Sequence, residues 1–487
     1  MTAGFEEEPR ADNRTPGRAA MTSGFDDLLS PSELKKFGVG TGTVAEVFAR
    51  IVMAAPDAVP QVDIANAATL PGLAELPQGS VSRASNLLLH LKLLVQKERL
   101  VVRPGRPIIP LKLGPDWGLI GVRIHSRGGR PAEVAGVLAP LDGTGIDAKF
   151  SVDVTDAEDH EALVKKIVDV VRALVKNAKR EVLGVGVELG AHVHQGRVTL
   201  PSFAGGSFPL GEILSKALPG RPIVVDNDVN ARAALQIWRK DAGSTTLRFP
   251  ERDFAVVAVF EERVGGALVI DRRVYRGHRG RAGEIGHLTV DYARPRRCTS
   301  DGLDGAVSGA KGFDDPCLCV AAADPAGRGY GHVDALATPV RIAGELGIDG
   351  PDFGQAAREP GTDQAGHTTR IGEVFRIAGE ALGRGIAAMV NVANPGNLLL
   401  LLPPELAEPT EGSAAAQYTQ AIEHALDRDC FTAAASDARA GRPTLQIEPM
   451  DPEDLQDALP ARVSVLDRFI AHARGEESPD AADATST

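Results

Sequence analysis

Residues 265–287 read GGALVIDRRVYRGHRGRAGEIGH, and this stretch places a carboxylate and an imidazole three positions apart between glycines. Glycine lets the backbone approach a ligand closely or adopt a positive φ. Glu284 accepts hydrogen bonds from hydroxyl groups, and His287 either forms hydrogen bonds or ligates a metal. The segment GEIGH (283–287) also fits a plain helix start with a surface glutamate and a buried histidine. The surrounding sequence has to decide between these interpretations.

The composition is that of an ordinary globular protein with several domains. A chain of 487 residues predicts about three domains, and the net charge of −12 argues against a protein that coats nucleic acid along its whole surface. With only four cysteines the chain is not a disulfide scaffold, and the close spacing of Cys298, Cys317 and Cys319 favours a metal site over disulfides. No apolar run reaches about 18 residues and the first residues lack a signal-peptide core, so we expect a cytoplasmic protein.

Composition changes along the chain predict its domains. Polar, charged and Pro- or Gly-rich ends predict disorder over 1–30 and 474–487. After Pro115, β-like apolar runs alternate with helical patterns such as 156–178 and 229–240, which predicts an α/β body. We expect one lobe over 114–232 and a second over 233–465, with insertions at 298–316 and 404–460.

Residues 31–113 form a separate basic module. They contain ten Lys/Arg against six Asp/Glu, a net of +4 in a chain whose total is −12. Helical patterns fit 43–55, 59–70 and 77–100, and two β-like runs joined by PGRP (104–107) follow. Three helices and a hairpin with a basic tip predict a winged helix-turn-helix that binds double-stranded DNA. The alternative is a small helical oligomerisation domain, and the long connection TLPGLAELPQG (69–79) makes the recognition residues less certain than the module.

The predicted DNA contacts lie on the third helix and the hairpin. Short polar and arginine side chains on a helix suit the base edges of the major groove, and arginines on a hairpin suit the minor groove or phosphates. The residues are Gln78, Ser80, Ser82, Arg83 and Asn86 on the helix, and Arg103 and Arg106 on the hairpin.

From residue 43 to 402 the order and spacing of the motifs resemble the ROK family of repressors, open reading frames and sugar kinases, in its transcriptional-regulator branch. The combination of GEIGH with an upstream Asn-Asp-x-Asn is the specific feature. The segments are GRP (105–107), LIGVRI (119–124), VLGVGVELGAHVHQGRV (182–198), VVDNDVNARAAL (224–235), 265–287 and LGRGIAAMVNVANPGNLLLL (382–401). The resemblance implies a two-lobed, actin-like (ribonuclease H-like) fold of the ATPase and sugar-kinase type, with a sugar bound between the lobes.

The resemblance also implies a role for the opening segment. Glu284 and His287 look like contacts to sugar hydroxyls, with Asn227 and Asp228 on the facing wall and Asp334 in the place of a further acidic contact. In the family's kinases the residue matching Asp228 is the base that deprotonates the attacking hydroxyl.

A zinc site is implied near the same histidine, although the family's third cysteine is missing. His332 takes its place, so that His287, Cys317, Cys319 and His332 make a Cys₂His₂ set suited to structural Zn²⁺, with Cys298 as a competing ligand. The alternative is a degenerate site without metal.

The nucleotide-binding elements of the family are altered. Arg123 and His125 replace an Asp and a Gly of the first phosphate element, and two adjacent carboxylates, Glu261 and Glu262, occupy the second. Leu401 and Leu402 replace a glycine pair on the adenosine side. Because these changes oppose a triphosphate by charge or bulk, we expect no ATP binding and no enzyme activity.

The sequence therefore predicts a sugar-responsive transcriptional regulator, most simply a repressor of carbohydrate genes, acting as a homodimer or homotetramer on a palindromic operator. A ROK-type sugar kinase with an appended N-terminal module is the main alternative. A DNA-binding architectural protein with a vestigial pocket is a weaker one.

Overall fold

The structure is a computed structural model of the whole chain. It describes thirteen parts of the chain, and the fold is given for these alone. They are residue 25 and residues 28–55, 57–66, 75–98, 109–127, 130–157, 159–200, 207–239, 248–249, 252–291, 331–431, 443–450 and 457–474.

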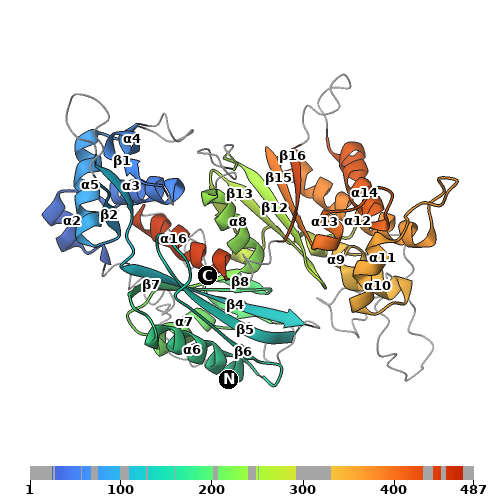
Figure 1. The fold of residues 1–487 in the computed structure, drawn as a ribbon, viewed down its shortest axis with the longest axis horizontal. Helices are drawn as coiled ribbons and strands as arrows, with labels where there is room; N and C mark the ends of the chain where they lie inside the picture. The colour runs from blue at the N-terminus through green and yellow to red at the C-terminus, as the bar shows by residue number, and fades with distance from the viewer. Residues whose placement is uncertain are drawn as a thin grey trace, which may run out of the picture.

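The N-terminal module is a helical cluster on a small antiparallel sheet (Figure 1). Val44, Phe48 and Ile51 follow a helical spacing and are fully buried. The sheet has the strand order β1-β3-β2. The elements are α2 (Pro31–Phe37), α3 (Thr41–Ala54), β1 (Val59–Pro60), α4 (Gln61–Ala65), α5 (Gln78–His90), β2 (Leu94–Gln96) and β3 (Pro110–Leu113).

The third helix of this module is shorter than the sequence predicts. Helix α5 ends at His90, and Lys92 has a positive φ of 58°, after which the chain enters strand β2. Leu94 is buried as predicted, but it lies on a strand rather than on the helix. The apolar run of leucines hides this change because both conformations bury the same side chains. The expected hairpin tip, with Arg103 and Arg106, lies outside the described residues.

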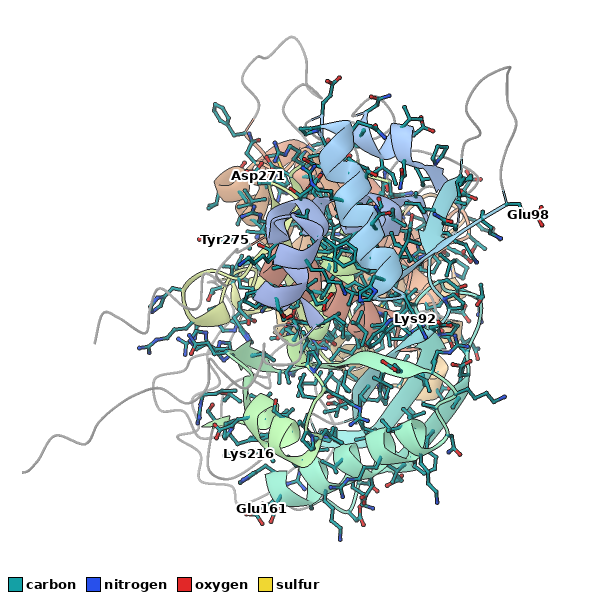
Figure 2. All side chains as sticks on the ribbon, turned by 90° about the vertical axis from the view of Figure 1, so that its left-hand side faces the viewer. Lys92, Glu98, Glu161, Lys216, Asp271 and Tyr275 are labelled. Carbon is teal, nitrogen blue, oxygen red and sulfur yellow. The ribbon has the colours of Figure 1, made fainter. Side chains whose placement is uncertain are left out.

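Lobe 1, residues 114–227, is a five-stranded sheet with helices α6 and α7 on one face. Its strand order is β11-β7-β4-β5-β6, in which β4, β5 and β6 are antiparallel and β4, β7 and β11 are parallel. Figure 2 shows Glu161 of α6 and Lys216 of α7 pointing outward at the end of the molecule far from the N-terminal module. The elements are β4 (Trp117–Arg127), β5 (Arg130–Pro140), β6 (Ala148–Asp153), α6 (His160–Lys176), β7 (Glu181–Leu189), β8 (His192–His194), β9 (Arg197–Thr199), β10 (Ser207–Phe208), α7 (Leu210–Ala217) and β11 (Ile223–Asn227).

Lobe 2, residues 252–450, repeats this strand order in its sheet β14-β13-β12-β15-β16. Helices α12 and α14 cover one face and share a core with alternate residues of β12 and β15. The elements are β12 (Phe254–Val259), β13 (Val264–Ile270), β14 (Arg273–Tyr275), η2 (His278–Gly280), η3 (Ile285–His287), α9 (Val333–Leu336), α10 (Pro339–Leu346), η4 (Gly350–Asp352), α11 (Phe353–Arg358), α12 (Arg370–Ala393), β15 (Asn397–Leu402), α13 (Pro404–Ala407), α14 (Ala414–Asp429) and β16 (Thr444–Pro449).

Two helices lie between the lobes. Helix α8 (Asp228–Trp238) packs on the other face of the lobe 2 sheet and against α16, and ten of its eleven residues are buried. Helix α16 (Leu459–Ala473) packs on β4 and β7 of lobe 1 and on α3 of the N-terminal module. Phe469 of α16 stacks edge-on with Phe48 of α3 at 5.2 Å and with Phe25 at 5.3 Å. One continuous apolar core therefore joins the N-terminal module to lobe 1.

The structure differs from the predicted boundaries in four places. The predicted division at residue 232 falls inside α8, and residues 459–465 pack on lobe 1 instead of lobe 2. Phe25 and Leu29, in the range predicted to be disordered, are buried. Within 404–460, the described elements α13, α14 and β16 belong to the body of lobe 2 and form no insertion. The segments 298–316 and 475–487 lie outside the described residues.

No single helix in the described ranges is long and apolar enough to cross a membrane, and only the bent pair α2 and α3 passes that test by length and composition.

Candidate functional site

Asn227 lies where β11 ends and α8 begins, and its side chain caps the helix. Its Oδ1 accepts hydrogen bonds from the backbone N–H of Val229 at 2.9 Å and of Asn230 at 3.4 Å. Its Nδ2 donates to the carbonyl of Ala191 at 3.0 Å. An asparagine cap satisfies backbone donors that the first helical turn leaves unpaired. Asn227, a predicted sugar contact, therefore acts as the N-cap of α8 in this structure.

Asp228, on the first turn of α8, is buried in ion pairs with two arginines. Its Oδ2 accepts a hydrogen bond from Arg263, a residue in the turn between β12 and β13. The same Oδ2 is 3.9 Å from Nη1 of Arg232. Burial raises the pKa of the Asp228 carboxyl, but the positive charges of Arg263 and Arg232 outweigh it, so that the pKa lies below its ordinary value. The residue at the kinase base position is therefore held as a paired carboxylate.

Arg123 lies beside this pair and adds a third guanidinium. Its Nε is 4.0 Å from Oε1 of Glu188, a carboxylate with no exposed surface on the neighbouring strand β7. Burial lowers the pKa of Arg123, while the Glu188 charge opposes this effect. Both Arg232 and Arg263 lie over the ring of Phe260, at 5.2 and 3.9 Å from its centroid.

Glu284, His287 and Asp334 form a second wall of the candidate site, and the structure brings these three residues together. His287 lies between two carboxylates: its Nε2 is 3.8 Å from Oε2 of Glu284, and its Nδ1 is 3.7 Å from Oδ2 of Asp334. The Glu284 and His287 side chains are 43% and 42% exposed, whereas Asp334 is 10% exposed. Burial raises the pKa of Asp334, and the His287 charge opposes the rise. Two groups of this wall are open to a ligand.

The glycine inside GEIGH is explained by this wall. A Cβ on Gly286 would lie 2.1 Å from Oδ1 of Asp334, which in turn accepts a hydrogen bond of 2.7 Å from the N–H of Val264. Only glycine lets the loop pack this closely on the carboxylate.

Two of the four predicted zinc ligands, His287 and His332, are described. The rings of His287 and His332 lie 6.0 Å apart and tilted, and residues 289 and 332 form an isolated bridge that fixes the spacing. Two imidazoles bound to one tetrahedral Zn²⁺ at about 2.0 Å bring their centroids to roughly 5 Å. Burial lowers the pKa of His332, which favours the neutral form that ligates metals. Within the described ranges no group of three or more ligating side chains gathers, and Cys298, Cys317 and Cys319 lie outside them.

The sequence of this region matches a known family. The model of the ROK family matches residues 142–326, which include Asn227, Asp228, Glu284 and His287. The central part of the chain is therefore similar to the ROK family.

Curated relatives include both repressors and kinases. The xylose repressor of Caldicellulosiruptor bescii is 25% identical over 227 residues, which is 45% of this chain and 53% of that protein. The glucokinase of Halalkalibacterium halodurans is 33% identical over 108 residues, 22% of this chain and 30% of that protein. The chain thus spans about half or less of the length of the curated relatives it matches.

The fold agrees with a solved ROK structure. A ROK family transcriptional regulator described as a homologue of the Escherichia coli MLC protein superposes with a TM-score of 0.60 at 17% identity, over 90% of this chain and 99% of that one. The predicted fold class, an α/β body of the ROK type behind an N-terminal helix-turn-helix, is confirmed.

The residues at the predicted nucleotide-binding positions lie in both lobes. Glu261 is exposed and Glu262 half-buried in the turn between β12 and β13, next to Arg263. His125 is half-buried on β4, and Leu401 and Leu402 are buried on β15.

The predicted DNA-contacting face of α5 is open to solvent. Gln78, Arg83 and Asn86 are exposed, and Ser80 and Ser82 are half-exposed, while Val81, Leu87 and Leu88 on the other side are buried. Arg83 donates to the hydroxyl of Ser80 at 3.2 Å. The helix therefore presents a polar face with one arginine.

Sequence reasoning missed Glu188, Arg232 and Arg263 as members of the site. Arg263 follows the two glutamates that drew attention to the second phosphate element, and Arg232 lies one turn after Asp228. A cation four residues after an acid on a helix is a usable signal. The approach of Arg263 to Asp228 leaves no such signal in the sequence, because it depends on how lobe 2 packs against α8.

Proposed function

We propose that this protein is a sugar-responsive, DNA-binding transcriptional repressor without kinase activity. The carrying observation is the single apolar core that joins the N-terminal module to lobe 1 through α16. A recognition helix rigidly attached to a sugar-binding lobe transmits a change in lobe position to DNA affinity. The repressor names among the relatives agree with this function.

The paired state of Asp228 supports the absence of kinase activity. A general base has to accept the proton of the attacking hydroxyl, and a carboxylate bound to Arg263 and facing Arg232 is a weaker base with an occupied oxygen. The two glutamates in the turn before Arg263 add repulsion toward a triphosphate.

Selection of bound fragments from the source genome with the purified full chain, at a stated salt concentration, tests the DNA reading. We expect one palindromic motif near genes of sugar transport or breakdown, read by a homodimer or homotetramer. Recovery of nothing above background would remove the regulator proposal.

Variants of charged residues test the interface. Arg83→Ala and Arg106→Ala should each weaken operator binding about tenfold and reduce its salt dependence. Lys216→Ala removes the same charge from the far end of lobe 1 and serves as the control (Figure 2). Equal affinity of all three variants would place the interface elsewhere.

Glu284→Gln should blunt the response of DNA binding to an effector and leave ligand-free affinity for DNA unchanged, because its side chain is exposed in the pocket. An unchanged response would remove Glu284 from the sugar site.

We also propose that His287 and His332, with Cys317 and Cys319, hold a structural Zn²⁺, with Cys298 as the alternative ligand. The metal would anchor the GEIGH loop against α9 and so order the hydroxyl-binding wall. Chelation should lower the melting temperature of the wild type and leave a His332→Ala variant unaffected. Metal analysis that finds no zinc in the purified chain would contradict this proposal.

A sugar kinase is the second candidate, favoured by the glucokinase relative and by the retained Asp228. It predicts ATP-dependent phosphorylation of a hexose that Asp228→Asn abolishes. ATP binding in a calorimetric titration would revive it.

A further inference from the structure

Strand β6 forms an exposed outer edge of the lobe 1 sheet. It is the last strand in the order β11-β7-β4-β5-β6, and among the described strands only β5 pairs with it. Four of its six residues are exposed and the other two are half-buried. Figure 1 shows β6 at the lower rim of the molecule. An uncovered edge strand offers a row of N–H and C=O groups to which a further strand can bind.

The other edges of the two large sheets are better protected. Strand β11 packs against α7, α8 and α16, and four of its five residues are buried. Strand β14 has only three residues, and β16 ends at a proline and has one exposed residue among six. Strand β6 has six residues and no proline. Of these edges, β6 is therefore the best suited to pairing with another strand.

The ladder with β5 fixes which backbone groups of β6 point outward. Val154 donates its N–H to the carbonyl of Ala132, and this bond continues the register of the ladder. In an antiparallel ladder, alternate residues exchange hydrogen bonds with the neighbouring strand. The even-numbered residues of β6 therefore bond to β5, and the N–H and C=O groups of Lys149, Ser151 and Asp153 point away from the sheet.

The side chains of this edge are complementary to those of a second copy. When two β6 strands pair antiparallel across a two-fold axis at Ser151, Lys149 of each copy lies opposite Asp153 of the other. On the other face of the sheet, Phe150, which is 46% exposed, lies opposite Val152 of the second copy. Opposite charges and aromatic–β-branched pairs both stabilise antiparallel neighbours. One register thus gives two ion pairs and two apolar contacts.

The lysine also selects this register. A lysine on an edge strand opposes pairing with an unrelated strand, because its charge then lacks a partner. Lys149 is 49% exposed and contacts Asp457 at 2.5 Å, so its charge is open to a second carboxylate. Moving the axis by one residue toward the N-terminus places Lys149 opposite Ser151 and Asp153 opposite Asp147. That register loses both ion pairs and brings like charges together.

We propose that β6 is an interface between two copies of this chain, in which the two lobe 1 sheets join into one continuous antiparallel sheet across a two-fold axis at Ser151. Each outward-facing residue then exchanges two backbone hydrogen bonds with its counterpart, and the same patch serves both copies, as an isologous dimer requires. Because lobe 1 shares a core with the N-terminal module, the pairing fixes the relative positions of the two modules. The inference concerns self-association and holds whether or not the protein binds DNA.

Sedimentation of the full chain at about 1–100 µM measures self-association. The wild type should form dimers or larger oligomers in this range. Ser151→Pro should weaken association at least about tenfold, because it removes an outward N–H on the axis and leaves the bonds to β5 in place. Asp153→Lys places two lysines opposite each other and should also weaken it. Lys216→Asp, on α7 beside the opposite edge strand β11, is the charge control and should leave association unchanged.

A cysteine on the axis tests the register. Ser151→Cys places two thiols on directly opposed residues, whose Cα atoms are about 5.5 Å apart in such a pair, within reach of a disulfide. Mild oxidation should give an interchain disulfide, and mass spectrometry of the digest should join residue 151 to residue 151. Lys216→Cys, at a side chain that is 74% exposed, is the matched control and should not cross-link at this rate.

Three results overturn the inference. The first is a wild type that stays monomeric at about 100 µM. The second is an unchanged dissociation constant in both Ser151→Pro and Asp153→Lys, and the third is a Ser151→Cys variant that cross-links no faster than Lys216→Cys. Circular dichroism checks the fold of each variant, and if Ser151→Pro unfolds, Asp153→Lys and the cross-link decide.

Discussion

The two lobes contain five-stranded sheets with the same strand order and directions, and each is covered on one face by its own helices, but the helix on the other face differs. In lobe 2 the covering helices α12 and α14 belong to the lobe itself, and a Cβ on Gly379 would lie 2.1 Å from the carbonyl of Tyr418. In lobe 1 one face is covered by α16, from the far end of the described chain, and a Cβ on Gly186 would lie 1.8 Å from the carbonyl of Ala461. Because α16 also contacts α3, lobe 1 is coupled to the N-terminal module, whereas α8 connects lobe 2 to α16.

The largest expected effect breaks that coupling. Phe469→Ala removes a fully buried ring that contacts Phe25 and Phe48, and should lower the free energy of unfolding by about 3–5 kcal/mol. Denaturant unfolding measures it. Phe431→Ala, at a side chain that is 76% exposed, is the control and should change stability by less than about 0.5 kcal/mol. Equal effects would mean that α16 does not dock as described.

Matched glycine variants compare the two lobes directly. Gly186→Ala and Gly379→Ala each force a methyl group against a backbone carbonyl and should each cost about 2–3 kcal/mol. Gly350→Ala, with open space around it, should be neutral. Only Gly186→Ala should also increase hydrogen exchange in α3, because only it displaces α16. Increased exchange in α3 for both variants would refute the separate covering of the lobes.

The ion pairs of Asp228 link the lobes and make a smaller, pH-dependent contribution. The folded pKa of Asp228 lies below its ordinary value, so its stabilisation is present above that value, about 3.9, and is lost as the pH falls through the folded pKa. Asp228→Asn should cost about 1–2 kcal/mol at pH 7, less than a fully buried pair because Arg263 is partly exposed. Denaturant curves at pH 7, 5 and 3 should show the difference shrinking below about pH 4. A pH-independent difference would speak against these pairs.

The smallest effect is confined to lobe 2. Glu373→Gln on α12 weakens a largely exposed pair with Arg376, whose closest distance is 2.8 Å, and should cost about 0.5 kcal/mol or less. The loss should disappear at high salt, because exposed charges are screened. A cost above about 1 kcal/mol would show that the surface network of α12 and α14 contributes more than exposed pairs do.

Local patterns in the sequence account for much of the fold. Alternating strands and helices predict lobe 1 and the first half of lobe 2, and the burial of Val44, Phe48, Val81 and Leu88 follows from their helical spacing. Residues 404–460 were misinterpreted because Pro, Gly and Asp surround α13 and β16 and hide the periodic stretch at Tyr418, Ile422 and Leu426. The end of α5 was missed because a run of leucines satisfies both helix and strand.

The sequence by itself determined the placement of Glu284 and His287 side by side, because both belong to one short motif whose glycine has to pack on Asp334. It also determined the resemblance to the ROK family and the polar face of α5. Only the tertiary structure decided the arginine cluster around Asp228 and the place of α16. Arg123, Asp228 and Arg263 lie far apart in the sequence. Helix α16 packs on lobe 1 although all of lobe 2 lies between them in the sequence. Such contacts depend on how two packed lobes meet, and no local spacing in the sequence records that.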